Sequence, residues 1–245
     1  MSYLGYTQLI SHYANFLYKF KEAPITILEI GIDRGQTTIP FLHNLVASNT
    51  AFTYIGVDIR EDGTVVEQLH QMDGVRSWPL VQQTPDSEQN PNFYYFIENS
   101  LDWLPQFTET NPEFKFDIVL LDGDHNYHTV TEELKYFNQL TSPHSLCVLD
   151  DYYGKYAHKD DYYADKPTHD GLNHKKISRD GAKQGMQLAV QDFLKENPHW
   201  QFHGKELHAG PDWEPVIITQ ELILKLNNNK ISFSFRQDSK EDSNP

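Results

Sequence analysis

The segment that decides the fold runs from residue 116 to residue 153 and reads FDIVLLDGDHNYHTVTEELKYFNQLTSPHSLCVLDDYY. It contains two short apolar runs, residues 118–121 and 146–149, separated by a helix-length stretch of mixed polarity. Short apolar runs on either side of a helix are typical of buried parallel strands in a strand–helix–strand unit. The segment therefore predicts an α/β fold.

Both apolar runs end in acidic residues. Asp122 and Asp124 follow the first run, and Asp150 and Asp151 follow the second. Ligands of open α/β sheets bind at the carboxyl ends of the strands, and carboxylates gathered there repel one another unless a cation compensates them. Oxygen ligands favour Mg²⁺, Ca²⁺ or Mn²⁺ over zinc. The alternative is that these acids cap loops and helices, with Asp124 or Asn126 as an N-cap, which explains one acid better than four.

The rest of the chain alternates between strand-like and helix-like patterns. We expect strands at residues 25–30, 52–57, 93–97 and 216–218, and helices at residues 7–20, 37–46, 65–72, 101–107, 129–140 and 182–194. Residues 73–92 are expected to form an irregular loop. Alternating strands and helices predict one doubly wound sheet.

The length of 245 residues suits a single domain, which we place at residues 1–236. Residues 1–22 are expected to form an N-terminal helical extension. Residues 152–179 have no apolar periodicity, which makes them a candidate lid over the site. Residues 237–245 are polar and charged and are expected to be a disordered tail.

Composition excludes several classes of function. The net charge of −15 argues against binding to nucleic acid or to an anionic membrane, because both require a positive surface. The mean hydropathy is −0.62, and no apolar run is long enough to span a membrane. A single cysteine, Cys147, allows no intrachain disulfide, and the N-terminus does not resemble a signal peptide. We therefore expect a cytoplasmic protein.

A glycine-containing loop follows the first expected strand, with residues 29–37 reading EIGIDRGQT. Gly31 and Gly35 let the backbone turn sharply and approach a ligand closely, and the free N–H groups of the helix that follows attract an anion. Thr37 adds a hydroxyl group. Asp33 stands where the dinucleotide fingerprint has a glycine, which disfavours a pyrophosphate. Taken alone, the pattern fits an ordinary turn equally well.

Asp58 closes the second expected strand, which ends in the residues YIGVD. An acid at this position accepts hydrogen bonds from both ribose hydroxyls in nucleotide-binding sheets. Its distance from Gly35 is close to the roughly 20 residues that such a fingerprint expects. A strand-terminal aspartate is equally often a helix cap. Together, the loop and Asp58 indicate an adenosine-type ligand.

In this order, these features resemble class I S-adenosylmethionine-dependent methyltransferases. The acidic strand ends resemble the metal-dependent O-methyltransferase branch, which includes antibiotic-sugar and macrolide enzymes, and the cephalosporin-hydroxylase-like group shares their pattern. The resemblance covers about residues 25–194. It implies a single Rossmann-like methyltransferase sheet of about seven strands, mostly parallel with an antiparallel late strand, and helices on both faces.

The resemblance also implies roles for individual residues. The residues expected to bind S-adenosyl-L-methionine are Glu29, Gly31, Gly35, Thr37, Asp58, Asn99, Ser100 and Asp122. Those expected to bind Mg²⁺ or another divalent cation are Asp122, Asp150 and Asp151. The catalytic base would be Asp124, by analogy with the sugar-methylating branch, or His125. We prefer Asp124 modestly, although a histidine titrates near neutrality and needs less tuning.

The expected function is metal-assisted O-methylation of a hydroxyl on a small polyhydroxylated molecule, either a sugar or a natural-product-like compound. Two alternatives stay open: a cephalosporin-hydroxylase-like metal enzyme on the same fold, and a non-catalytic nucleotide-binding protein. The acceptor carries no motif that identifies it. The apolar residues of the N-terminal helix would either seal the cofactor cleft or form the face of a homo-oligomer.

Overall fold

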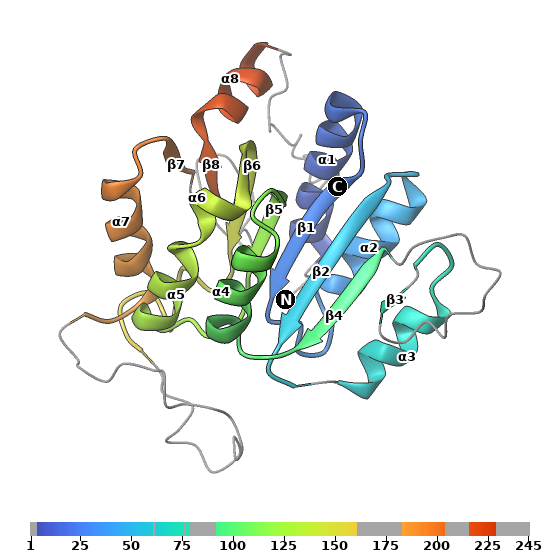
Figure 1. Cartoon of the computed structure of the whole chain (residues 1–245), viewed down its shortest axis with the longest axis horizontal. Coiled ribbons are helices and arrows are strands. Elements are labelled where there is room, and N and C mark those ends of the chain that lie inside the picture. Colours follow the sequence, from blue (N-terminus) through green and yellow to red (C-terminus); the bar gives the residue numbers. More distant parts are fainter. Residues whose placement is uncertain are drawn as a thin grey trace, which may run out of the picture.

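The computed structural model describes residues 4–60, 62–75, 77–78, 92–160, 183–203 and 216–228. These residues form a central twisted sheet with helices on both sides (Figure 1). No helix among them is long and apolar enough to cross a membrane. The expected tail at residues 237–245 and most of the expected lid lie outside the described residues.

The described elements follow one another as alternating helices and strands. In chain order they are α1 (Leu4–Lys21), β1 (Ile25–Ile30), α2 (Thr38–Ala47), β2 (Phe52–Asp58), α3 (Gly63–Gln71), β3 (Ser77–Trp78), β4 (Phe93–Ile97), α4 (Ser100–Thr110), β5 (Phe116–Leu121), α5 (Tyr127–Leu134), α6 (Phe137–Leu140), β6 (Thr141–Leu149), α7 (Met186–Glu196), β7 (Trp200–His203), β8 (Val216–Thr219) and α8 (Gln220–Asn228).

The described strands form one sheet in the order β3-β4-β2-β1-β5-β6-β8-β7. All pairings from β3 to β6 are parallel, whereas β8 runs antiparallel to both β6 and β7. This sheet confirms the predicted Rossmann-like methyltransferase fold with an antiparallel late strand. About seven strands were expected, and the described residues form eight. The additional strand is β3, which is two residues long and lies at one edge of the sheet.

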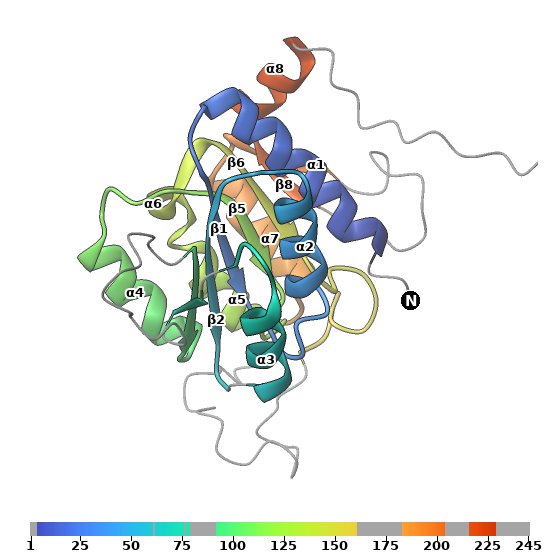
Figure 2. The same ribbon diagram turned by 90° about the vertical axis from the view of Figure 1, so that its right-hand side faces the viewer.

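Both faces of the sheet are covered, so the central strands are mostly apolar, with Glu29 in β1 and Asp117 in β5 as buried exceptions. All six residues of β5 are buried. In β1, Ile25 and Ile27 belong to the core shared with α1, α2, α3 and α8, while Leu28 and Ile30 belong to the core shared with α4, α5, α6 and α7. Figure 2 shows α2 and α3 on one side of the sheet and α4 on the other. Burial on both faces explains why these strands have continuous rather than alternating hydrophobicity.

The parallel strands end level with one another. Ile30 pairs with Leu121, and Leu121 pairs with Leu149, so the residues that follow β1, β5 and β6 emerge side by side. The ladder continues one residue further, because the N–H of Asp122 donates to the carbonyl of Ile30 (2.8 Å) and that of Asp150 donates to the carbonyl of Leu121 (3.0 Å). β2 and β4 extend the sheet on one side of β1, and β5 and β6 on the other. The order therefore switches between β1 and β5, where open sheets bind their ligands.

The N-terminal helix α1 is part of the core. Its residues Ile10, Tyr13 and Leu17 are buried against the sheet and α2. At its C-terminal end, the ammonium of Lys21 donates to both carboxylate oxygens of the buried Asp117 in β5, at 2.8 and 2.7 Å. The apolar side of α1 is thus used in the core of the molecule, and the two roles considered for it, sealing the cofactor cleft and forming an oligomer face, stay predictions.

Several element boundaries differ from the sequence predictions. The helix predicted at residues 129–140 is divided into α5 and α6, because the N–H of Tyr136 donates to Glu133, three residues back, and tightens the backbone there. The helix predicted from residue 182 begins at Met186. The irregular loop at residues 73–92 includes β3, although most of it lies outside the described residues.

Two elements near the C-terminus were not predicted. β7 is only four residues long and becomes a strand by pairing with β8, so it has little local signal. α8 buries Leu222 and Leu226, which are four residues apart, and this spacing is a helical signal that the sequence does carry.

A buried glutamate joins α4 to α5. Glu133 is 2 % exposed, and its Oε1 accepts a hydrogen bond from the hydroxyl of Ser100 at 2.6 Å. Burial raises the pKa of Glu133 to about 8, although the Ser100 hydrogen bond partly counteracts this shift. Near neutral pH the folded protein therefore keeps this carboxyl group protonated.

We expect the Glu133→Gln substitution to reduce the pH dependence of stability. Between about pH 4.5 and about pH 8, the unfolded chain has released a proton that the folded chain keeps. The contribution of Glu133 to the free energy of unfolding is therefore complete below about pH 4.5. It falls by roughly 1 kcal/mol per pH unit as the pH rises through this window. Glutamine removes this slope and keeps an acceptor for Ser100.

Urea denaturation of wild type, Glu133→Gln and the matched control Glu132→Gln, at several pH values in this window, measures the effect. Glu132 lies next to Glu133 in α5 but forms an exposed ion pair with Lys135. Because it is solvated, its substitution should leave the slope unchanged. The assignment fails if the two variants show the same pH dependence.

Candidate active site

The loop after β1 lies directly against the end of β5. Gly31 has φ +89°, and a Cβ atom at this position would lie 2.1 Å from the carbonyl oxygen of Asp122. No other residue fits there without moving one of the two strands. Gly35 has φ +69°, so it too adopts a backbone conformation that favours glycine. The close approach at Gly31 is to the main chain of Asp122, whereas a Cβ atom at Gly35 would meet the side chains of Ile39 and Val65. The predicted approach of both glycines to a ligand stays a prediction.

Asp33, the residue that departs from the dinucleotide fingerprint, turns toward the surface. It has φ +43°, and its Oδ1 forms an ion pair with the Nη2 of Arg60 at 2.6 Å. Both side chains are more than half exposed. The Asp33 charge is therefore compensated at the rim of the loop.

Glu29 and Thr37 are buried beside the start of α2. Glu29 Oε2 accepts hydrogen bonds from the hydroxyls of Thr38 (2.5 Å) and Tyr54 (2.7 Å), and burial raises the pKa of Glu29 to about 7. Its Oε1 and the Oγ1 of Thr37 are buried without a hydrogen-bond partner among the described residues. Buried polar atoms are rarely left unpaired, so two such atoms beside the glycine loop are consistent with a ligand that supplies partners.

Asp58 holds the glycine loop in place. Its Oδ2 accepts hydrogen bonds from the N–H groups of Ile32 and Asp33, both at 2.8 Å, and its Oδ1 accepts one from the N–H of Arg60 at 3.1 Å. A carboxylate has about four acceptor positions, so this arrangement leaves capacity for a ligand hydroxyl. The fixed orientation of Asp58 is a feature that the sequence did not predict.

Two exposed isoleucines flank Asp58. Ile59 is 45 % exposed and follows it directly, and Ile97, which is 53 % exposed, pairs with Asp58 across β2 and β4. Large apolar side chains exposed at the carboxyl edge of a sheet offer a surface for a flat apolar ligand group. Sequence reasoning missed both residues; the available signal for Ile59 was an isoleucine directly after the strand-terminal Asp58, and Ile97 carried no such signal.

The structure gives Asn99 and Ser100 internal hydrogen bonds. Asn99 caps α4, because its Oδ1 accepts from the N–H of Leu101 at 2.9 Å, and Ser100 donates to Glu133. Both lie just after β4, at the same edge as Asp58. Their predicted contact with adenine stays a prediction.

Three predicted residues come together at the ends of β5 and β6. Asp122, His125 and Asp150 each offer a ligand atom, and these atoms lie within 4.8 Å of one another. Asp122 and Asp150 share a hydrogen bond, and the pKa of Asp122 is raised well above its usual range, first by burial and then by Asp150. Burial raises the pKa of Asp150 as well. Such a pair retains a proton unless a cation replaces it.

His125 takes the place in this group that the sequence analysis gave to Asp151. The Asp151 side chain is 53 % exposed, and its Oδ2 lies 4.0 Å from the Nε2 of His125. Asp151 therefore borders the group without being one of its three members. Burial lowers the pKa of His125, while Asp150 and Asp151 act in the opposite direction.

Asp124 is occupied by the start of α5. Its Oδ1 accepts from the amide of Asn126 at 2.7 Å, and its Oδ2 accepts from the hydroxyl of Thr129 at 2.6 Å. Burial raises the pKa of Asp124, although these hydrogen bonds oppose the shift. Of the two N-caps considered in the sequence, Asn126 is the N-cap of α5, and Asp124 instead accepts hydrogen bonds from the side chains of Asn126 and Thr129.

The described part of the expected lid is packed against the body of the protein. The N–H groups of Met186 and Gln187 donate to the carbonyls of Tyr156 (2.9 Å) and Ala157 (3.2 Å). The first turn of α7 is therefore capped by this segment. Residues 161–179 of the predicted lid lie outside the described residues.

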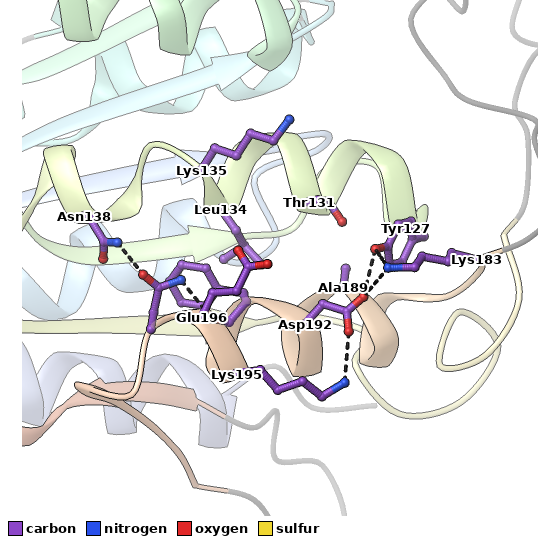
Figure 3. Close-up of a pocket in the computed structure, with 12 residues that line it drawn as sticks. Tyr127, Thr131, Leu134, Lys135, Asn138, Lys183, Ala189, Asp192, Lys195 and Glu196 are labelled. Carbon is purple, nitrogen blue, oxygen red and sulfur yellow. Dashed lines mark hydrogen bonds and ion pairs between the residues drawn. The ribbon is translucent and has the colours of Figure 1, made fainter.

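A cavity of about 510 Å³ lies elsewhere, on the outer side of α5 and α7 (Figure 3). Its lining includes Tyr127, Lys183 and Asp192 but none of the predicted site residues. This cavity therefore does not include the carboxylate group. We place the candidate active site at the strand ends, because the titratable groups with shifted pKa values and the close-approach glycine meet there.

Comparison with known proteins identifies the family of the chain. Residues 28–152, just over half of the chain, match a family model described as a methyltransferase domain. The matched range begins in β1 and ends just after Asp151, so it contains every predicted site residue. A search of curated proteins finds no match.

Solved structures show the same fold at low identity. CalS11, a TDP-rhamnose 3'-O-methyltransferase of calicheamicin biosynthesis, aligns with a TM-score of 0.54 and 13 % identity over 87 % of this chain and 80 % of that chain. The CMeT domain of the citrinin polyketide synthase aligns with a TM-score of 0.50 and 15 % identity over 87 % of this chain and 51 % of that chain. The chain therefore belongs to the methyltransferase domain family and has the Rossmann-like fold of S-adenosylmethionine-dependent methyltransferases.

Proposed function

We propose that this protein is a metal-assisted O-methyltransferase that transfers a methyl group from S-adenosyl-L-methionine to a hydroxyl of a small polyhydroxylated molecule. One observation carries the proposal: the group formed by Asp122, His125 and Asp150 touches the glycine loop, through the contact between Gly31 and the main chain of Asp122. A donor lying on the loop and an acceptor oxygen lying on the acidic group would be neighbours. Such proximity is the main requirement of a displacement reaction between two bound molecules.

The donor would lie over Gly31 and Gly35 with its amino-acid part toward α2. The buried Thr37 hydroxyl, which has no partner among the described residues, is suited to bind the donor's carboxylate. Asp122 would bind its amino group. When bound, the donor supplies an electrophilic methyl group on a positively charged sulfur, and a surrounding rich in carboxylates favours that charge.

The nucleoside part would lie toward β2 and β4. Asp58 would accept hydrogen bonds from the ribose, because its orientation is already fixed by the loop N–H groups. Ile59 and Ile97 offer apolar surface for the adenine, next to the predicted contacts Asn99 and Ser100. CalS11, described as a sugar-nucleotide O-methyltransferase, shares the fold, and this supports the choice of a hydroxyl acceptor.

The donor set of the acidic group fits a divalent cation. Two adjacent carboxylates of which one keeps a proton, as the raised pKa of Asp122 indicates, gain stability when a cation replaces that proton. Together with the imidazole of His125, they suit Mg²⁺ or Mn²⁺ and also admit a softer metal. Asp122, Asp150 and either His125 or Asp151 would hold the ion. When bound, the ion lowers the pKa of an acceptor hydroxyl.

The chain itself must then orient the hydroxyl and accept its proton. His125 is better placed for this than the originally preferred Asp124, because both oxygens of Asp124 already accept hydrogen bonds from α5. The His125 ring is 6 % exposed and packs against Tyr156 with the ring centroids 4.9 Å apart, which excludes water from one side. We propose His125 as the base where Asp151 completes the ligand set of the ion, and Asp124 as the base where His125 itself binds the ion, because a metal-bound imidazole has no lone pair left to accept a proton.

Calorimetric titration with S-adenosylhomocysteine, in excess Mg²⁺ and again in EDTA, tests the proposed donor and metal together. We expect micromolar binding in both conditions, with a heat that changes when the metal is present, because Asp122 contacts both ligands. Absence of binding in both conditions would remove the donor site and with it the proposed function.

The Asp150→Asn substitution tests the metal site, with Asp151→Asn as its matched control. Loss of a residue that only orients a metal ligand typically costs roughly 10–100-fold in metal affinity, so we expect loss of the ligand Asp150 in Asp150→Asn to raise the Mn²⁺ dissociation constant by at least this factor. The change for Asp151→Asn should be less than about threefold, because its side chain is half exposed. Equal losses in both variants would favour the ligand set predicted from the sequence.

Comparison of His125→Gln with Asp124→Asn tests the base. Loss of a general base typically lowers kcat by roughly 10²–10⁴-fold. The residual rate of His125→Gln should then rise in proportion to the hydroxide concentration, without the inflection that a titrating base produces. Asp124→Asn should instead lower thermal stability, because it weakens the start of α5, and leave the shape of the pH profile unchanged. The opposite pattern would assign the base to Asp124. Turnover is measured with a diol acceptor identified by screening.

A further inference from the structure

A buried carboxylate joins three separate segments beside the active site. Asp160 is 6 % exposed, and its Oδ1 accepts hydrogen bonds from the N–H of Tyr127 at 2.9 Å and from the N–H of Gly185 at 2.8 Å. Tyr127 is the first residue of α5, and Gly185 is the N-cap of α7. The segment after β6 is thus attached at its far end to the starts of two helices.

These attachments restrain the residues of the proposed metal site. Tyr127 follows His125 by two residues, so its main chain sets the position of the His125 turn. Asp150 begins the segment that ends at Asp160 and includes Tyr156, whose ring packs against that of His125. Asp160 therefore closes a loop in which Asp150 and His125 face each other.

The segment after β6 packs closely against the start of α7. Gly185 has φ +85°, and a Cβ atom there would lie 2.5 Å from the Cα of His158 and 2.6 Å from the carbonyl oxygen of Ala157. The side-chain amide of Gln187 also donates to the carbonyl of Tyr152 at 3.1 Å. The segment is thus held along its length, with Asp160 as its charged anchor.

The electrostatics of this position favour a carboxylate. The N-termini of α5 and α7 each present partial positive charge and N–H groups that have no acceptor within their own helix, and Asp160 accepts one hydrogen bond from each. A hydrogen bond to an ionised acceptor is stronger than one to a neutral acceptor. A neutral side chain of the same shape would keep the geometry but hold it less tightly.

On the outer side, Tyr127 is held by its side chain. Its phenol donates to Asp192 Oδ2 at 2.9 Å and accepts from the ammonium of Lys183 at 3.0 Å, as Figure 3 shows. These contacts lie at one end of the cavity between α5 and α7, away from the acidic group. Asp192 and Asp160 therefore both bind Tyr127, Asp192 through the phenol and Asp160 through the main-chain N–H.

We propose that Asp160 is a positioning residue, which holds the His125 turn and the Asp150–Asp160 segment at the separation that brings Asp122, His125 and Asp150 into one group. The inference rests on the proposed function for the role of that group. The restraint itself is a property of the fold and is measurable without ligand or metal.

Titration with Mn²⁺, followed by electron paramagnetic resonance, measures the effect on the group in Asp160→Ala, Asp160→Asn and Asp192→Ala. We expect Asp160→Ala to raise the Mn²⁺ dissociation constant about tenfold, as loss of an outer-shell partner does. Asp160→Asn keeps an acceptor oxygen and should restore most of the affinity. Asp192→Ala removes a carboxylate from the other side of Tyr127 and should leave the affinity unchanged.

Amide hydrogen exchange in the absence of metal measures the restraint. Asp160→Ala should lower the protection of the Tyr127 and Gly185 amides about tenfold and shift the His125 ring signals, while strand amides stay as in wild type. If both amides keep their protection, or if Asp160→Ala loses no Mn²⁺ affinity while the wild type binds, the proposal is overturned. If wild type does not bind Mn²⁺, the metal function fails, and the exchange and ring signals still decide whether Asp160 positions His125.

Discussion

The contact between Gly31 and the main chain of Asp122 is the constraint on which the rest of the site depends. It arises because β1 and β5 are neighbours at the switch point of the sheet and end at the same level. The missing side chain at Gly31 lets the loop after β1 turn across the end of β5. The loop that would carry the methyl donor and the acids that would carry the metal are therefore joined by backbone, and their relative position does not depend on flexible side chains.

Burial of acids at this edge is unfavourable unless a ligand is bound. Burial raises the pKa of Asp122 and of Asp150, Asp150 raises the pKa of Asp122 further, and Asp58 and Asp150 contribute to the raised pKa of Glu29. A fold selected only for stability would place apolar or solvated residues there, because buried like charges destabilise the folded state. A cation and a positively charged sulfonium would both relieve this repulsion, so one electrostatic arrangement serves two proposed ligands.

Polar contacts of the helices α4, α5 and α7 support the position of the acidic group. Asp124 stabilises the start of α5, Glu133 joins α5 to α4, and Asp160 joins the starts of α5 and α7. None of these acids belongs to the group formed by Asp122, His125 and Asp150. Polar contacts with these helices thus determine where His125 lies, whereas the position of Asp122 and Asp150 follows directly from the strand register.

The sequence by itself determined the parallel strands and their acidic ends, because continuous apolar runs and the residues that stop them are local signals. Asp122, Asp150, Gly31 and Asp58 were found in this way. Only the tertiary structure decided that His125 rather than Asp151 joins the acidic group and that hydrogen bonds with α5 occupy Asp124. It also revealed that Asp160, in a stretch without periodicity, anchors the segment after β6. Side-chain direction at a strand end depends on contacts with segments distant in the chain, and no local pattern records them.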